Sequence, residues 1–152
     1  MKILVSGCLM GIRCRYDGKS TRNMEFPEGI EPIPFCPEVY GGLTTPRDPA
    51  EIRDGRVISK AGRDVTREYT RGAEEAVALC RRLGITAAVM QDRSPSCGKG
   101  QIHNGLFDGG MTEGDGVTVQ KLKEAGICVF SASEVMKDPR ILTNRQPEVS
   151  ET

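Results

Sequence analysis

Short apolar runs that alternate with helical periodicity constrain the fold of this chain more than any other feature. The runs lie at residues 3–5, 85–90 and 127–130, and each has the length and composition of a strand buried on both faces. Apolar residues recur at steps of mostly three and four over residues 65–83, and a second helix is expected over residues 116–125. Strands that alternate with helices predict a sheet of parallel strands joined by helical crossovers.

Two turn signals add smaller elements to this sheet. The dipeptides Asp-Gly at 54–55 and Asn-Gly at 104–105 stand between short extended stretches and predict two-residue β-hairpins. The expected fold is therefore α/β, a three-layer, Rossmann- or flavodoxin-like, mostly parallel sheet with small β-hairpin decorations. At 152 residues the chain fits a single domain. We expect this domain over residues 1–136 and a loosely ordered polar tail over residues 137–152.

Composition argues against several classes of function. The 21 basic and 21 acidic residues balance, which argues against the electrostatic field of a protein that binds nucleic acid or a membrane surface. No apolar run approaches the roughly 20 residues of a membrane span, and the start, MKILVSG, is typical of a first strand rather than a signal peptide. We therefore expect a cytoplasmic protein. In that reducing compartment its six cysteines favour free thiols, catalysis or metal binding.

Three of the cysteines follow extended segments. Cys8 comes after the first apolar run, Cys36 after an extended stretch at residues 30–35, and Cys97 after the run at 85–90. Because the carboxyl ends of parallel strands share one edge of a sheet, the three thiols are expected to meet there. Convergent thiolates bind soft metal centres, and three ligands leave one coordination position open for a reaction. The spacing contains no CxxC pair, so incidental loop cysteines remain an open alternative.

The remaining cysteines and the single histidine have other interpretations. Cys80 lies on the apolar face of the long helix and Cys128 lies within the last apolar run, so both are expected to pack in the core. Cys14 is in a loop six residues after Cys8, where it is a fourth ligand, a redox partner or a bystander. His103 flanks the second hairpin signal and is expected at the surface.

Polar residues beside the three cysteines are candidates for catalysis. Glu38, Asp17, Ser94 and Ser96 lie in the same loops, where they would orient a substrate or move a proton. Turn hydrogen bonds are the alternative for Asp17 and for the two serines. Basic residues in these loops would lower thiolate pKa values and offset a negative cluster, or else are solvated charges: Arg13, Arg15, Arg47, Arg93 and Lys99.

Several motifs in one order resemble a known family. The stretches LVSGCLMGIRCRYDGKS, FCPEVYGGLTTPR, GRDVT, RSPSCGKGQIHNG and GDGVT, which run from Leu4 to Thr118, are similar to those of the DUF523 family, whose characterised members include thiouracil desulfurases. The resemblance implies a 4Fe-4S cluster held by three cysteines, with the fourth iron free to take sulfur from a thiolated base. By motif the three ligands are Cys8, Cys36 and Cys97, the same trio that follows the extended segments.

The function that this resemblance implies is an iron–sulfur-dependent desulfurase for a small thiolated nucleobase such as 2-thiouracil. The open iron would polarise the C–S bond, and water would attack the carbon with help from Glu38 or Asp17. Ser94 or Ser96 would hydrogen-bond the leaving sulfur or the edge of the base. Two alternatives remain open, a carrier of sulfur or of the cluster and a non-catalytic zinc-binding protein.

Overall fold

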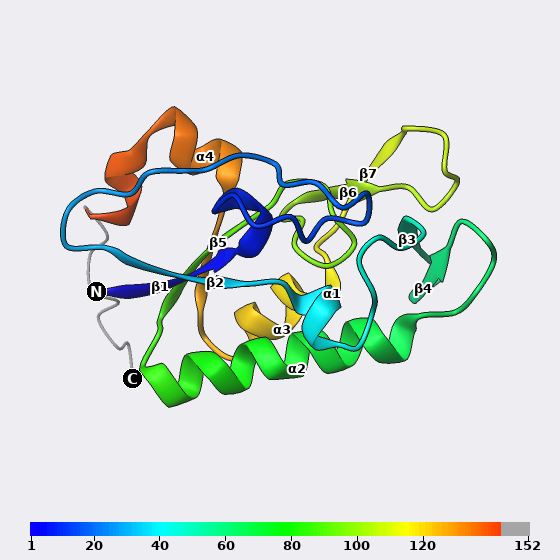
Figure 1. Cartoon of the computed structure of the whole chain (residues 1–152), viewed down its shortest axis with the longest axis horizontal. Coiled ribbons are helices and arrows are strands. Elements are labelled where there is room, and N and C mark those ends of the chain that lie inside the picture. Colours follow the sequence, from blue (N-terminus) through cyan, green and yellow to red (C-terminus); the bar gives the residue numbers. More distant parts are fainter. Residues whose placement is uncertain (144–152) are drawn as a thin grey trace.

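A four-stranded parallel sheet forms the centre of the structure, a computed structural model that describes residues 1–143 (Figure 1). Across the sheet the strands are β2 (Glu31–Phe35), β1 (Lys2–Ser6), β5 (Ala87–Met90) and β8 (Cys128–Ser131). Every neighbouring pair is parallel, and the order matches the first four strands of a flavodoxin-like sheet. The predicted α/β fold is confirmed.

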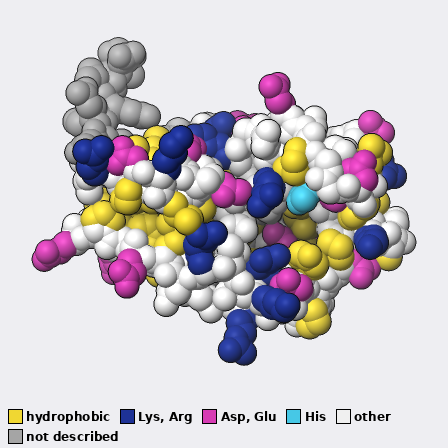
Figure 2. Space-filling view, turned by 90° about the horizontal axis from the view of Figure 1, so that it is seen from above, with side chains coloured by type: hydrophobic (Ala, Val, Ile, Leu, Met, Phe, Trp, Pro, Cys, Tyr) yellow, Lys and Arg dark blue, Asp and Glu magenta, His cyan; other side chains and the backbone are white. Residues whose placement is uncertain are grey.

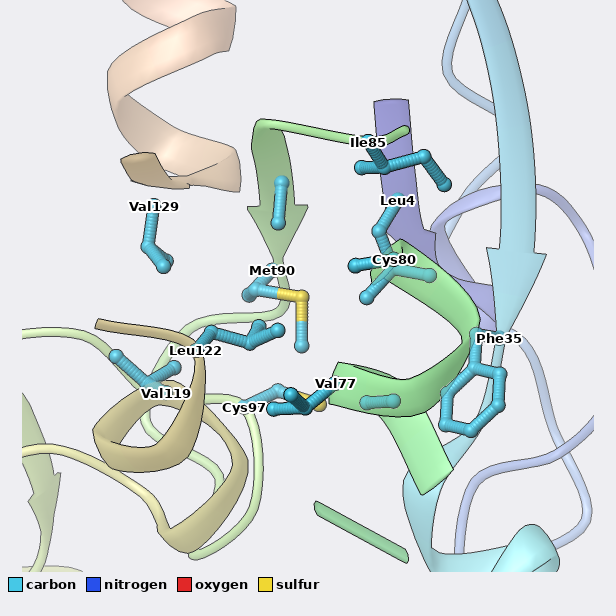
Figure 3. Close-up of a cluster of buried hydrophobic side chains, with 12 residues drawn as sticks. Leu4, Phe35, Val77, Cys80, Ile85, Met90, Cys97, Val119, Leu122 and Val129 are labelled. Atoms are coloured by element: carbon cyan, nitrogen blue, oxygen red, sulfur yellow. The ribbon is translucent and has the colours of Figure 1, made fainter. Parts of the chain in front are cut away.

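Helices α2 (Thr66–Leu83) and α3 (Val117–Glu124) cover one face of the sheet. The apolar side of α2 and the inner side of α3 meet the sheet in an aliphatic core that contains Leu4, Val77, Cys80, Ile85, Met90, Val119 and Leu122 (Figure 3). Cys80 is 1% exposed, which agrees with its expected place in the core, whereas Cys128 is only half-buried. Burial of this stripe holds the long helix against the strands, since an isolated helix is marginal in water.

The other face of the sheet is covered by α4 (Ala132–Lys137), the 3₁₀ helix η2 (Pro139–Leu142) and the segment that follows η1 (Gly7–Leu9). Figure 1 shows α4 and α2 on opposite sides of the strands, so the fold has three layers. No helix within residues 1–143 is both long enough and apolar enough to cross a membrane.

Strand β2 is regular although it contains two prolines. Pro32 and Pro34 pair in register with Ile3 and Val5 of β1, and β2 is the edge strand of the sheet. Two residues apart, the prolines face the same way, so their missing N–H groups lie on the open edge and cost no ladder hydrogen bond.

The first predicted hairpin is confirmed. For the second, the prediction of a two-residue turn at 104–105 is wrong. Strands β3 (Ala50–Arg53) and β4 (Arg56–Ser59) pair antiparallel around residues 54–55. Strand β6 (Gln101–His103) pairs instead with β7 (Met111–Glu113), which leaves residues 104–110 as a loop. The Asn-Gly pair makes no two-residue turn, since the Leu106 N–H that would close it bonds the Asn104 side chain, and a carboxylate on β3 accepts the N–H groups of Gly105 and Phe107.

The chain stays ordered beyond residue 136, where we expected a loose tail. Pro139–Leu142 form η2, and Leu142 is 1% exposed in the core beneath α4. Burial of Leu142 in this cluster packs the segment after α4 against the sheet. The rest of the expected tail, residues 144–152, lies outside the described residues, and the division into one domain and a tail remains a proposal.

Candidate active site

A cavity of about 570 Å³ opens at the carboxyl edge of the sheet. Its walls include residues that directly follow β1, β2 and β5, as expected for a ligand site in a parallel α/β sheet. Figure 2 shows the hollow with an acidic side chain inside it, lysine and arginine side chains around it and the histidine at its edge. The site therefore lies where the strand-end argument expects one.

Cys8, Cys36 and Cys97 all line this one cavity. Cys8 lies in η1 directly after β1, and Cys36 precedes α1 (Pro37–Tyr40), the short helix that follows β2. Cys8 and Cys97 are buried, and Cys36 is half-buried. Burial raises the pKa of Cys8 and, more strongly, that of Cys97, so a metal ion that binds these thiols must displace their protons.

The loop that carries Cys97 is held by its own serine. The Ser94 hydroxyl oxygen accepts hydrogen bonds from the backbone N–H groups of Ser96 and Cys97, both at 3.0 Å, and the Ser94 carbonyl accepts one from Gly98. A Cβ atom on Gly98 would lie 2.7 Å from that carbonyl oxygen, so only glycine fits. These contacts place the Cys97 sulfur at the cavity wall.

Cys14 is the fourth thiol on the cavity wall, and it contacts Cys36. The Cys36 thiol donates to the Cys14 carbonyl at 3.6 Å, and a Cβ atom on Gly7 would lie 3.2 Å from the Cys14 sulfur. A hydrogen bond from the Cys14 thiol lowers the pKa of Cys36 to about 7, while the same bond raises the pKa of Cys14. Cys14 thus favours the thiolate form of Cys36.

A buried ion pair forms part of the cavity wall. Arg47 donates to Glu38 Oε2 from Nη2 at 2.6 Å and from Nε at 3.1 Å, and the two side chains are 7% and 15% exposed. The remaining Arg47 donors bind the Cys14 carbonyl, the Thr44 carbonyl and the Thr45 hydroxyl. One guanidinium therefore joins the loop of Cys14, the helix after Cys36 and the segment before β3, which fixes where the Glu38 carboxylate stands.

Tyr69 reaches the same cavity from α2. Burial, followed by the negative charge of the nearby Glu38, raises the pKa of Tyr69 well above its usual value. Helical periodicity placed Tyr69 only on the apolar stripe. A buried tyrosine hydroxyl needs a polar partner. A tyrosine on an otherwise apolar helix face was therefore the feature of the sequence that could have indicated a role at the site.

The other candidates divide between the cavity and its surroundings. Ser94 lines the cavity, whereas Ser96 is fully buried and hydrogen-bonds Thr118 of α3 at 2.8 Å. Asp17 is absent from the cavity wall; it accepts a hydrogen bond from the Lys19 N–H and lies 3.5 Å from Arg15, as its turn interpretation requires. His103, expected at the surface, is half-buried at the cavity.

The basic residues divide in the same way. Arg47, Arg15 and Arg93 line the cavity, while Arg13 does not. Lys99 lies outside the cavity wall and forms an ion pair with Glu134 at the start of α4. The positive charge expected near the thiols is therefore supplied by three of the five basic residues named from the sequence.

The donor set suits an iron–sulfur centre. Three cysteines from separate loops line one cavity, and thiolates are the ligands that hold such clusters. Among residues 1–143, no three histidine, cysteine or carboxylate side chains are grouped closely enough to hold a single metal ion. A single zinc ion with Zn–S bonds of about 2.3 Å needs its sulfurs almost in contact. A four-iron cluster is larger, and its ligands stand farther apart.

Comparisons with known proteins agree with this chemistry. The sequence model of a family described as 2-thiouracil desulfurase matches residues 3–134. An uncharacterised protein of Bacillus subtilis (strain 168), YbbK, is 38% identical over 146 residues, which cover 88% of this chain and 97% of that protein. A solved structure described as the [4Fe-4S]-dependent thiouracil desulfidase TudS (DUF523Vcz) is 44% identical, with a TM-score of 0.86 over 93% of this chain and 97% of that one.

Proposed function

The chain belongs to the 2-thiouracil desulfurase family, and on that premise we propose that it removes sulfur from a small thiolated pyrimidine such as 2-thiouracil, using a 4Fe-4S cluster. The observation that carries the proposal is that Cys8, Cys36 and Cys97, from three different strand ends, line one cavity. The reaction replaces the thiocarbonyl sulfur with oxygen from water. It yields uracil and sulfide and requires no electrons.

Cys8, Cys36 and Cys97 would hold the cluster, because they are the cavity thiols that lie in the segments after β1, β2 and β5. When bound through three thiolates, the cluster supplies one iron without a protein ligand, a Lewis acid for the thiocarbonyl sulfur. Cys14 would stand behind Cys36 as a hydrogen-bond donor to its sulfur. This assigns Cys14 a supporting role at the cluster.

Glu38 is the base that this arrangement favours. Both hydrogen bonds from Arg47 go to Oε2, so the guanidinium orients the carboxylate without occupying Oε1. A carboxylate held in this way accepts a proton from the attacking water and returns it to the leaving sulfide. Asp17 lies away from the cavity wall, and we assign it to its turn.

Ser94 is the donor that we favour for the substrate. Its oxygen already accepts two backbone N–H groups, so its own O–H proton is free to donate into the cavity that Ser94 lines. A donor there would stabilise negative charge on the sulfur or on the edge of the base. Ser96 bonds to Thr118 inside the protein, which leaves it a structural role.

The test is anaerobic reconstitution with iron and sulfide, followed by measurement of 2-thiouracil loss, uracil formation and sulfide release. We expect equal amounts of the three without any partner protein, which also separates an enzyme from a sulfur carrier. Glu38→Gln should retain its iron and lose about 10²- to 10⁴-fold in turnover, while Asp17→Asn should match the wild type. An iron-loaded wild type that leaves 2-thiouracil unchanged would refute the proposal.

The cytoplasmic location remains part of the proposal. All six cysteines are free thiols in the structure, which suits a reducing compartment. An open iron site is also better protected from oxidation there.

A further inference from the structure

We infer that Phe107 forms the face on which the substrate ring stacks and so determines binding of a flat heterocycle, an inference that rests on the proposed function. Phe107 lines the cavity in the loop between β6 and β7. It is half-buried, yet it belongs to none of the three apolar clusters that make up the core. An aromatic ring that borders a cavity without packing in the core offers its surface to a ligand.

The backbone at Phe107 is held in an unfavourable conformation. Its φ is 54°, in the left-handed region that residues with a Cβ seldom adopt. The carboxylate of Glu51 on β3, itself 8% exposed, accepts hydrogen bonds from the N–H groups of Gly105 at 2.9 Å and Phe107 at 3.1 Å. Such strain persists only where the surroundings over-determine it, and it concentrates at functional sites.

The whole loop is braced against the β3–β4 hairpin. Arg53 donates from Nε and Nη2 to the Gly105 carbonyl at 3.0 and 2.6 Å. Gly105 has φ of 87°, and a Cβ atom there would lie 2.6 Å from the Ile52 carbonyl oxygen. Within the loop, Asp108 accepts from the Asn104 side chain and from the Gly110 N–H. The ring is therefore presented by a pre-organised wall, which lowers the entropic cost of binding.

Leu106 provides the internal comparison. It adjoins Phe107 in the same loop, is 65% exposed and is absent from the cavity wall. The two backbone hydrogen bonds to Glu51 thus hold the loop so that Phe107 lies at the cavity and Leu106 lies in solvent. Stacking of a base on an aromatic ring tolerates many ring substituents. Phe107 would therefore select for a planar substrate ring rather than for particular hydrogen-bonding groups on the edge of that ring.

The kinetic test compares substitutions at these two neighbours in iron-reconstituted protein. Phe107→Leu should raise the KM for 2-thiouracil about tenfold, with iron content and kcat per iron within twofold of the wild type. Phe107→Tyr, which keeps the ring, should restore the KM, and Leu106→Ala should leave it unchanged. An unchanged KM in Phe107→Leu, or an equal rise in Leu106→Ala, would overturn the inference.

The binding test exploits the absence of tryptophan from the chain. Phe107→Trp and Leu106→Trp each introduce a single fluorophore, and the probe is uracil, the expected product, added to the reconstituted proteins. We expect saturable quenching in Phe107→Trp alone; no quenching, or equal quenching in both, overturns the inference. This outcome is independent of turnover, whereas failure of the wild type to consume 2-thiouracil would refute the proposed function itself.

Discussion

Replacement of Arg47 by methionine should strongly destabilise the protein. The side chain is 7% exposed and places all its donors on protein acceptors, two of them on the Glu38 carboxylate. Arg47→Met fills most of the volume but leaves the carboxylate, 15% exposed, without its partner. Breaking a buried pair in this way costs about 3–5 kcal/mol. That is a large part of the about 5–15 kcal/mol that stabilises a typical domain.

The double variant separates the lost pair from the lost packing. In Arg47→Met/Glu38→Leu no charge is left alone, so we expect it to be at least about 2 kcal/mol more stable than Arg47→Met. Arg47→Lys keeps the positive charge but loses the planar guanidinium that donates two hydrogen bonds to Glu38. Its stability should lie between those of the wild type and Arg47→Met. These comparisons ask whether the unpaired carboxylate, rather than the missing arginine stem, dominates the cost.

The assay is urea unfolding of metal-free protein, followed by circular dichroism because the chain has no tryptophan. Working without metal keeps the contribution of a bound cluster out of the free energy of unfolding. A loss below about 1 kcal/mol in Arg47→Met would show that solvent reaches the pair and that the structural reasoning fails. A double variant no more stable than Arg47→Met would contradict the role given to the unpaired charge.

Three further predictions test the thiols and the loop that carries one of them. Cys97→Ser should lose most of its iron in a colorimetric assay, because a hydroxyl replaces a thiolate poorly, whereas Cys80→Ala should keep its iron and melt at a lower temperature. Ser94→Ala should cut turnover per iron about tenfold to a thousandfold, while Ser96→Ala should lower the melting temperature with little kinetic effect. Equal activities in the two variants would refute a catalytic role for Ser94 and a structural one for Ser96. Gly98→Ala should lower both iron content and stability, since its Cβ atom has no room; a fully loaded variant would contradict that packing.

The strands and the edge where the cysteines gather could be predicted from the sequence because both depend on neighbouring residues. The short run Ala87–Met90 is apolar throughout because β5 is buried on both faces, and the pattern indicates this directly. The hairpin at 54–55 follows from backbone preferences of two residues. Cys8, Cys36 and Cys97 could be grouped because strand direction alone decides which end of a parallel sheet they occupy.

Tertiary structure decided which side chains turn toward the cavity. Ser94 and Ser96 look equivalent in the sequence, and only contact with Thr118 on α3 takes one of them away from the cavity. At 104–105 the Leu106 N–H that would close a two-residue turn bonds the Asn104 side chain instead, and Glu51, more than fifty residues earlier, holds the N–H groups of Gly105 and Phe107. Tyr69 and Arg47 meet Glu38 only after α2 packs beside α1. Such choices rest on hydrogen bonds between distant segments, and these partners become neighbours only when the chain has folded.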